Sequence, residues 1–165
     1  MINDEYWMRY ALAMAQCAAL ENEIPVGAVV VLNQQIIGYG WNRAISQHDA
    51  TAHAEIMAIR RAGQTVGNYR LLEATLYVAL EPCFMCAGAL IHSRLKRVVY
   101  AAQDTKTGAV GSMLNLLQYP GVNHFVMAEG GCLADTCSQL LSDFFRYRRW
   151  QQKNIKQCKQ AFDKR

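Results

Sequence analysis

Two short segments of this chain place metal-binding side chains at predicted helix starts, and they constrain the fold more than any other feature. Residues 51–55 are Thr-Ala-His-Ala-Glu, and residues 81–86 are Glu-Pro-Cys-Phe-Met-Cys. Cys83 and Cys86 are three residues apart, so on a helix both thiols lie on one face and can bind one ion. His53 can supply a third ligand. The chain must then fold so that two helix starts, distant in the sequence, meet at one point.

This set of ligands indicates catalysis rather than a structural site. Structural zinc sites are usually closed by four protein ligands, whereas two cysteines and one histidine leave a position for water. The positive end of a helix also lowers the pKa of a thiol and favours the thiolate that a metal requires. On an ideal helix Glu55 would point away from an ion bound by His53. At the looser first turn its carboxylate can reach a metal-activated water and carry a proton.

Each segment alone has an ordinary explanation. A single histidine at a helix start is usually a capping or core residue, and two cysteines on a helix are often buried small hydrophobic side chains. The two segments together, with Glu55 and Pro82, favour a metal site. The other cysteines have no such partners, and we interpret them as free thiols without a metal role: Cys17, Cys132, Cys137 and Cys158.

The composition is that of one globular domain over residues 1–165. The chain is 52% hydrophobic and 18% charged, and a chain of this length can bury roughly 70% of its unfolded surface without help from disulfides. The first residues are acidic where a secretory signal would be basic and then apolar, so we expect reduced thiols and a cytoplasmic protein. The longest aliphatic run, residues 26–32, is far shorter than the roughly 20 residues of a membrane span.

Charge is concentrated at the C-terminal end. The net charge is +4, but residues 146–165 hold eight basic side chains and one acidic side chain, which gives 8 − 1 = +7 and leaves −3 for the rest. A mildly acidic body with a basic C-terminal segment indicates contact with a polyanion, most often nucleic acid. The alternative is a solvated terminal helix whose charges only keep it soluble.

Periodicity and turn residues divide the chain into a helix, a hairpin and then alternating strands and helices. We expect Thr51 to cap the second helix, Gly63 to end it, and Pro82 to precede the third. This order predicts an α/β fold with three α/β/α layers around a mixed sheet. The predicted helices cover residues 4–21, 52–62, 83–92 and about 133–165, and the predicted strands cover residues 25–32, 36–41, 75–80, 97–102 and about 125–128.

The two metal-binding segments resemble a known family. His53-Ala54-Glu55 and Pro82-Cys83-Phe84-Met85-Cys86 form the signature of the zinc nucleobase deaminases, whose fold is cytidine deaminase-like. Within that superfamily the chain is most similar to the bacterial tRNA-specific adenosine deaminases. Further segments that carry this similarity are Gly40-Trp41-Asn42-Arg43, Asp104-Thr105-Lys106-Thr107-Gly108 and Leu141-Ser142-Asp143-Phe144-Phe145-Arg146.

The resemblance implies a reaction and a cofactor. His53, Cys83 and Cys86 would hold one Zn²⁺ per subunit, and Glu55 would shuttle protons. The reaction would be the hydrolysis of adenosine to inosine at the wobble position of a tRNA anticodon loop, with zinc-activated water as the nucleophile. The family also forms homodimers, so a tRNA anticodon stem-loop and a second copy are the expected partners.

The resemblance also implies substrate contacts. Asn42 and the Ala54 backbone would hold the purine, Asp104 and Lys106 would lie on a loop near the target nucleotide, and a patch on the C-terminal helix would touch the anticodon loop. That patch comprises Phe145, Arg146 and Arg149. Without the resemblance, Asn42 is an ordinary turn residue, Asp104 an ordinary loop cap, and aromatic residues on a helix are more often core.

Two other functions share some of these features. A deaminase of free cytosine, guanine or a nucleotide would carry the same signature, but it would need neither the basic C-terminal segment nor the Asp104 loop. A zinc-stabilised RNA-binding module without catalysis would have no need of a proton carrier such as Glu55.

Overall fold

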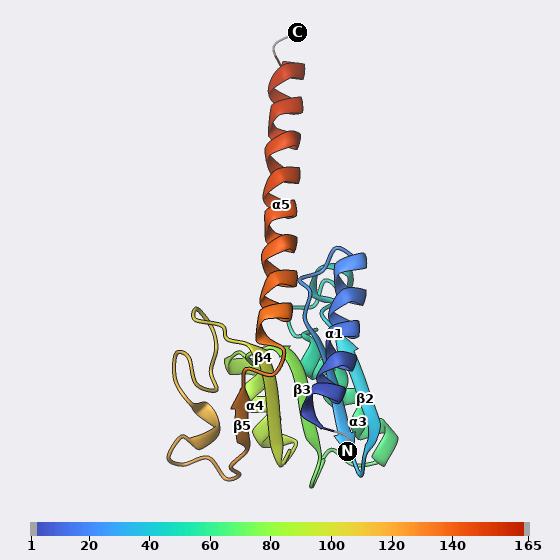
Figure 1. Ribbon diagram of the computed structural model, residues 1–165, viewed down its shortest axis with the longest axis vertical. Coiled ribbons are helices and arrows are strands. Elements are labelled where there is room, and N and C mark those ends of the chain that lie inside the picture. The colour runs from blue at the N-terminus through green and yellow to red at the C-terminus, as the bar shows by residue number, and fades with distance from the viewer. Residues whose placement is uncertain (1–2, 164–165) are drawn as a thin grey trace.

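The computed structural model describes residues 3–163 (Figure 1). Five strands and four main helices follow one another, with two short helical segments between them. The elements are α1 (Asp4–Leu20), β1 (Gly27–Leu32), β2 (Gln35–Trp41), α2 (Ala44–Gln47), α3 (Ala54–Val66), β3 (Thr75–Leu80), α4 (Phe84–His92), β4 (Arg97–Ala102), η1 (Leu116–Gln118), β5 (Met127–Gly130) and α5 (Ala134–Asp163). No helix in this part of the chain is both long and apolar enough to cross a membrane.

The five strands form one mixed sheet in the order β2-β1-β3-β4-β5. β1 is antiparallel to both β2 and β3, whereas β3, β4 and β5 are parallel to one another. The three parallel strands therefore end at one edge of the sheet. The mixed sheet predicted from the element order is confirmed.

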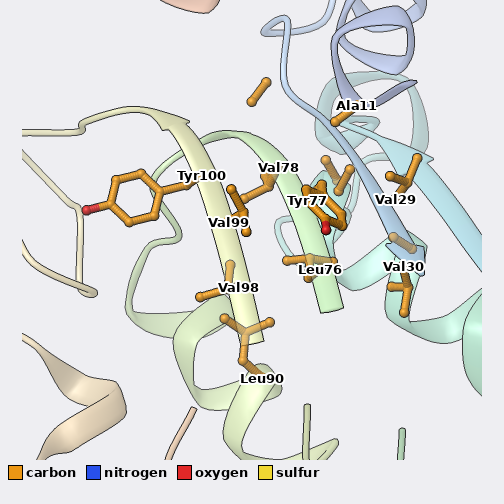
Figure 2. Close-up of a cluster of buried hydrophobic side chains, with 14 of the residues drawn as sticks. Ala11, Val29, Val30, Leu76, Tyr77, Val78, Leu90, Val98, Val99 and Tyr100 are labelled. Carbon is orange, nitrogen blue, oxygen red and sulfur yellow. The ribbon is translucent and has the colours of Figure 1, made fainter. Parts of the chain in front are cut away.

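Helices cover both faces of the sheet, which gives the predicted three layers. At Gly27 on β1 an added Cβ would lie 2.2 Å from the Ala15 nitrogen, so α1 packs directly on the backbone there. At Gly38 on β2, whose side-chain position faces the opposite side, an added Cβ would lie 2.3 Å from the Ala58 oxygen of α3. The strands between these helices are rich in valine and buried on both faces, as the cluster around Val78 and Val99 shows (Figure 2).

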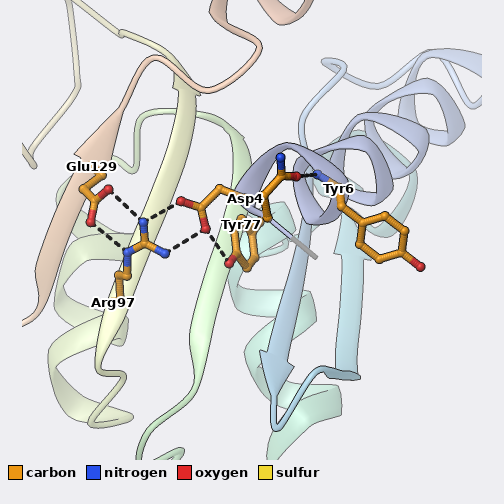
Figure 3. Close-up of polar contacts among 6 residues, drawn as sticks. Asp4, Tyr6, Tyr77, Arg97 and Glu129 are labelled. Carbon is orange, nitrogen blue, oxygen red and sulfur yellow. Dashed lines mark hydrogen bonds and ion pairs between the residues drawn. The ribbon is translucent and has the colours of Figure 1, made fainter. Parts of the chain in front are cut away.

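An ion-pair network fixes the start of α1 to the sheet (Figure 3). Both Asp4 carboxylate oxygens accept hydrogen bonds from the Arg97 guanidinium, at 2.8 and 2.7 Å, and Asp4 also accepts one from the Tyr77 hydroxyl at 2.8 Å. Arg97 pairs in addition with Glu129 at 2.7 Å. One network thus joins α1, β3, β4 and β5, and the Arg97 guanidinium holds the pKa of the Asp4 carboxyl below its ordinary value of 3.8.

Asp4→Asn is expected to lower the free energy of unfolding at neutral pH by about 1 kcal/mol, because the pair with Arg97 is partly exposed and screened by water. A lowered folded-state pKa stabilises the protein above the unfolded-state value and loses that effect as the pH falls. The difference between the two proteins should therefore shrink in urea titrations at about pH 3. Glu5→Gln, which removes an exposed carboxylate from the same turn, is the control. If the difference in free energy of unfolding were as large at about pH 3 as at neutral pH, the stabilising role assigned to the ion pair between Asp4 and Arg97 would be wrong.

Several boundaries differ from the sequence predictions. The prediction that Thr51 caps the second helix is wrong, because its hydroxyl bonds to Asp49 at 2.7 Å and His53 precedes the helix. The prediction that Gly63 ends this helix is also wrong: α3 continues to Val66 and ends at Gly67, whose φ of 67° suits glycine. β5 begins two residues later than predicted, and α2 and η1 were not predicted. The C-terminal helix begins one residue after Leu133, and residues 164 and 165 of the predicted span lie outside the described residues.

Candidate metal centre

The three predicted ligands meet at one edge of the sheet. His53 immediately precedes α3, Cys83 immediately precedes α4, and Cys86 lies in the first turn of α4. The His53 Nδ1 atom is 3.6 Å from the Cys83 Sγ and 3.5 Å from the Cys86 Sγ, and all ligand atoms lie within 4.8 Å of one another. Two thiols and one imidazole at this separation fit a zinc ion, which accepts sulfur and nitrogen ligands in tetrahedral geometry.

His53 is free to act as a ligand because another residue caps its helix. The side chain of a residue at this position usually accepts a backbone N–H of the first turn, but that of His53 makes no capping hydrogen bond. Instead the Asn42 Oδ1 atom accepts the Ala54 N–H at 3.0 Å. Asn42 follows β2, so the hairpin supplies the cap and the imidazole can face the two thiols.

The electrostatics of the cluster favour thiolate at one cysteine. The Cys86 thiol and the His53 imidazole beside it lower the pKa of Cys83 to about 4. The neighbouring Cys83 and burial raise the pKa of Cys86, and the contact with Cys83 raises the pKa of His53. A negative charge shared among three ligand side chains is what a divalent cation requires.

Glu55 lies beside this cluster rather than pointing away from it. It is in the first turn of α3, only 4% of its surface is exposed, and its carboxyl group is close to the Cys86 thiol. Burial raises the pKa of Glu55 to about 7. A carboxyl group with such a pKa can both accept and release a proton near neutral pH, which is what a proton carrier needs.

The predicted purine contacts, Asn42 and Ala54, are adjacent in space. The hydrogen bond between them occupies the Ala54 N–H and the Asn42 oxygen, which leaves the Asn42 Nδ2 group as a donor. Asn42 therefore has a structural role, as a cap, that the sequence interpretation as a turn residue did not include. Because Ala54 follows His53 in the chain, this hydrogen bond also places the Asn42 amide beside the backbone next to His53.

Two buried carboxylates that the sequence analysis did not single out hold the loops around the cluster. Glu81 accepts the backbone N–H groups of Asp104, Val110 and Ser112 and the Ser112 hydroxyl. Glu23 accepts the N–H groups of Ile45 and Ser46 at 3.2 and 2.6 Å. The position of Glu81 before Pro82, in a predicted turn, was the one sequence signal for Glu81. No sequence pattern indicated the role of Glu23.

The loop after β4 places Lys106, a predicted substrate contact, next to the C-terminal helix. Lys106 lines a cavity of about 380 Å³ together with residues of α5, and this cavity includes all three members of the predicted patch. Its lining is Lys106, Ser142, Phe145, Arg146 and Arg149. Asp104 does not line it: its carboxylate accepts the Lys106 and Thr107 N–H groups at 2.9 and 3.1 Å, which is the loop-cap geometry of the alternative interpretation.

The fold and the ligand set define a zinc-dependent deaminase domain. The family model for the cytidine and deoxycytidylate deaminase zinc-binding region matches residues 1–102. The chain is 54% identical over 151 residues to the tRNA-specific adenosine deaminase of Haemophilus influenzae, covering 91% of this chain and 87% of that protein. It is 43% identical to the enzyme of the same name from Bacillus subtilis, covering 88% and 91%.

A solved structure gives the same result. A chain from a study of A-to-I editing by tRNA:A34 deaminases at the wobble position of transfer RNA superposes with a TM-score of 0.79 at 40% identity, over 82% of this chain and 98% of that one. A guanine deaminase from Nitrosomonas europaea superposes with a TM-score of 0.72 at 25% identity, over 87% and 85%. This chain belongs to the tRNA-specific adenosine deaminase family within the zinc-dependent deaminases.

Proposed function

We propose that this protein converts adenosine to inosine at the wobble position of a tRNA anticodon by hydrolytic deamination. The observation that carries the proposal is the buried Glu55 carboxyl group beside the cluster of His53, Cys83 and Cys86. A structural metal site has no use for a buried carboxyl group that titrates near neutral pH, whereas a hydrolytic enzyme needs one. Membership of the family supports the choice of substrate.

His53, Cys83 and Cys86 would hold the zinc ion, and their distances and charge fit it. When bound there, zinc supplies Lewis acidity, which lowers the pKa of a coordinated water from 15.7 to about 7. With three protein ligands the site keeps room for that water. The remaining chemistry is done by side chains of the chain itself.

Glu55 would move the protons. Its carboxylate takes a proton from water as the C6–O bond forms, and delivers it to the adenine ring nitrogen N1. The same carboxylate then takes the remaining proton from the hydroxyl on C6 and gives it to the exocyclic amine, so that the C6–N bond breaks, the C6 carbonyl forms and ammonia leaves. The pKa of about 7 matches both directions of transfer. The Asn42 Nδ2 group would donate a hydrogen bond to the purine, because the Oδ1 atom of the same amide already accepts the Ala54 N–H.

Lys106, Phe145, Arg146 and Arg149 would hold the anticodon loop. They share one cavity, they carry three positive charges, and the Phe145 ring is 42% exposed and so available to stack on a base. A base in a hairpin loop is already partly unstacked, so extruding it costs less than opening a duplex. Asp104 would lie near the target nucleotide on the same loop, where its carboxylate also accepts a hydrogen bond from the Thr107 hydroxyl at 2.6 Å.

We also propose a homodimer in the cytoplasm. A cavity of about 630 Å³ lies between α3 and α4, lined by residues that include Ile59, Tyr69 and Ala89. Phe84 and Met85, at the start of α4, are also exposed. The cavity and the exposed apolar side chains both involve α4, and exposed apolar surface of this kind supports an interface on that helix. Sedimentation should give twice the chain mass, and a monomer at micromolar concentration would contradict the dimer.

The test compares substrates. Ammonia release should be rapid with an anticodon stem-loop carrying adenosine at the wobble position and undetectable with free adenine, cytosine or guanine. Inosine in the product RNA is the direct readout. Turnover of a free base but not of the RNA would identify a small-molecule deaminase. RNA binding without any inosine, in a single turnover with zinc bound, would identify a binding module.

A further inference from the structure

The C-terminal half of α5 extends beyond the body of the protein (Figure 1). α5 has 30 residues, but its buried side chains, such as Cys137 and Leu141, lie in its first turns. We call residues 150–163 the distal arm. Every side chain described in the distal arm is exposed or only partly buried, and Trp150 and Phe162 are 59% and 80% exposed. Packing against the domain therefore does not account for the presence of the distal arm.

Positive charges follow one side of the arm. Arg146, Arg149, Lys153 and Lys156 are spaced by three, four and three residues, so they form a stripe along one face of the helix. Over residues 3–163, Arg146 pairs with Asp143 at 3.3 Å, and no ion pair involves Arg149, Lys153 or Lys156. Lys159 adds a further positive charge about one turn beyond Lys156, roughly 60° around the helix from it. From Arg149 to Lys159 the charged segment is about 15 Å long.

The stripe begins at the candidate site. Arg146 and Arg149 line the cavity that also contains Lys106. The loop of Lys106 is tied to the metal cluster, because Gly108 forms a β-bridge with Cys83 and the Ala109 N–H bonds to the Pro82 oxygen at 2.9 Å. α5 rises from the edge of the sheet at which β3 and β4 end (Figure 1). The charges therefore lead from the site outward into solvent.

We propose that the distal arm binds the phosphate backbone of the double-helical stem that adjoins the deaminated loop. This inference rests on the proposed function. A hairpin whose loop enters the site must direct its stem away from the domain, and among the described residues the arm extends away from the domain beside the cavity of Lys106. Lysine is a flexible point charge suited to phosphates, and a stem read through its backbone places no demand on sequence.

A second kind of partner would use a different face of the arm. Ile155 and Phe162 are exposed and apolar, and on a helix they lie roughly 100° or more from Lys153 and Lys156. A helix with basic and apolar faces can also lie on an anionic membrane. Continuity with the cavity of Lys106 favours RNA, because a membrane would give no reason for the stripe to begin there.

The test uses two hairpin RNAs with the same anticodon loop, one with a full stem and one with a stem just long enough to close the loop. In the full-length protein, Lys153→Gln, Lys156→Gln and Lys159→Gln are combined, since lysine and glutamine have similar helix propensity. Kd and KM for the full stem should rise about tenfold, and the slope of log Kd against log salt should fall by up to about 0.9 per lost phosphate contact. Both constants for the short stem, and kcat for both, should stay within about twofold.

The control combines Gln152→Ala, Gln157→Ala and Gln160→Ala, which changes the same segment without changing charge, and should leave all constants unaltered. Equal losses on both stems, or no loss on either, would overturn the proposal. So would lysine-dependent binding to vesicles containing anionic phospholipid with unchanged RNA affinity. Kd is measured independently of turnover, so a failure of the proposed deamination would appear as absent inosine and would remain distinguishable.

Discussion

Glu55→Gln is expected to reduce kcat for inosine formation by about 10²–10⁴-fold or more while zinc stays bound. Glutamine fills the same space in the buried site, but its amide cannot accept and release the proton that the reaction moves. The measurement is single-turnover inosine formation, together with the zinc content of the same sample.

Stability separates this explanation from misfolding. Burying a carboxyl group is unfavourable, as the raised pKa of Glu55 reflects, so the glutamine variant should unfold at the same or a higher urea concentration than the unmodified protein. Full activity in the variant would refute the role assigned to Glu55. Lost activity accompanied by lost stability and lost zinc would show that the carboxyl group is structural.

Cys83→Ala is expected to abolish both zinc binding and activity. Mutation of groups that merely support a metal ligand typically costs 10–100-fold in affinity, so removal of a ligand itself should cost at least about 100-fold. Because zinc bound to the folded state adds to folding free energy, the melting temperature should also fall, and a chelator should have little further effect on it. Zinc per chain, inosine formation and thermal unfolding are measured on one preparation.

Cys158→Ala is the matched control, because this cysteine is exposed on α5 and is not in the metal cluster. It should retain zinc, activity and stability. A Cys83→Ala protein that still binds one zinc as tightly as the unmodified chain would contradict the ligand assignment, whatever its activity.

The parts of the fold predicted best are those that local pattern alone determines. β3 and β4 have the predicted boundaries because each is a short apolar run buried on both faces. The predicted C-terminal boundary of α3, at Gly63, was wrong because a glycine inside a helix costs only about 1 kcal/mol and is tolerated where neighbours pack well. Gly67 ends the helix instead, since its left-handed backbone is required there.

The site shows the same division. The spacing of Cys83 and Cys86, with His53 at a second helix start, was sufficient to predict that the three side chains meet. The capping of α3 by Asn42 and the anchoring of loops by Glu81 and Glu23 join residues far apart in the sequence. Such hydrogen bonds leave no periodic signal, so they could not be predicted from one sequence. They nevertheless fix the orientation of His53 and the loop of Lys106.

X-ray absorption at the zinc edge of the purified protein would show which atoms bind the metal. We expect one zinc per chain with two sulfur neighbours at about 2.3 Å and lighter neighbours, one of them an imidazole nitrogen, at about 2.0–2.1 Å. The lighter shell should also include a solvent oxygen that a substrate analogue can displace. A third sulfur, a complete set of four protein ligands, or protein that is active without zinc would contradict a catalytic zinc site with three protein ligands.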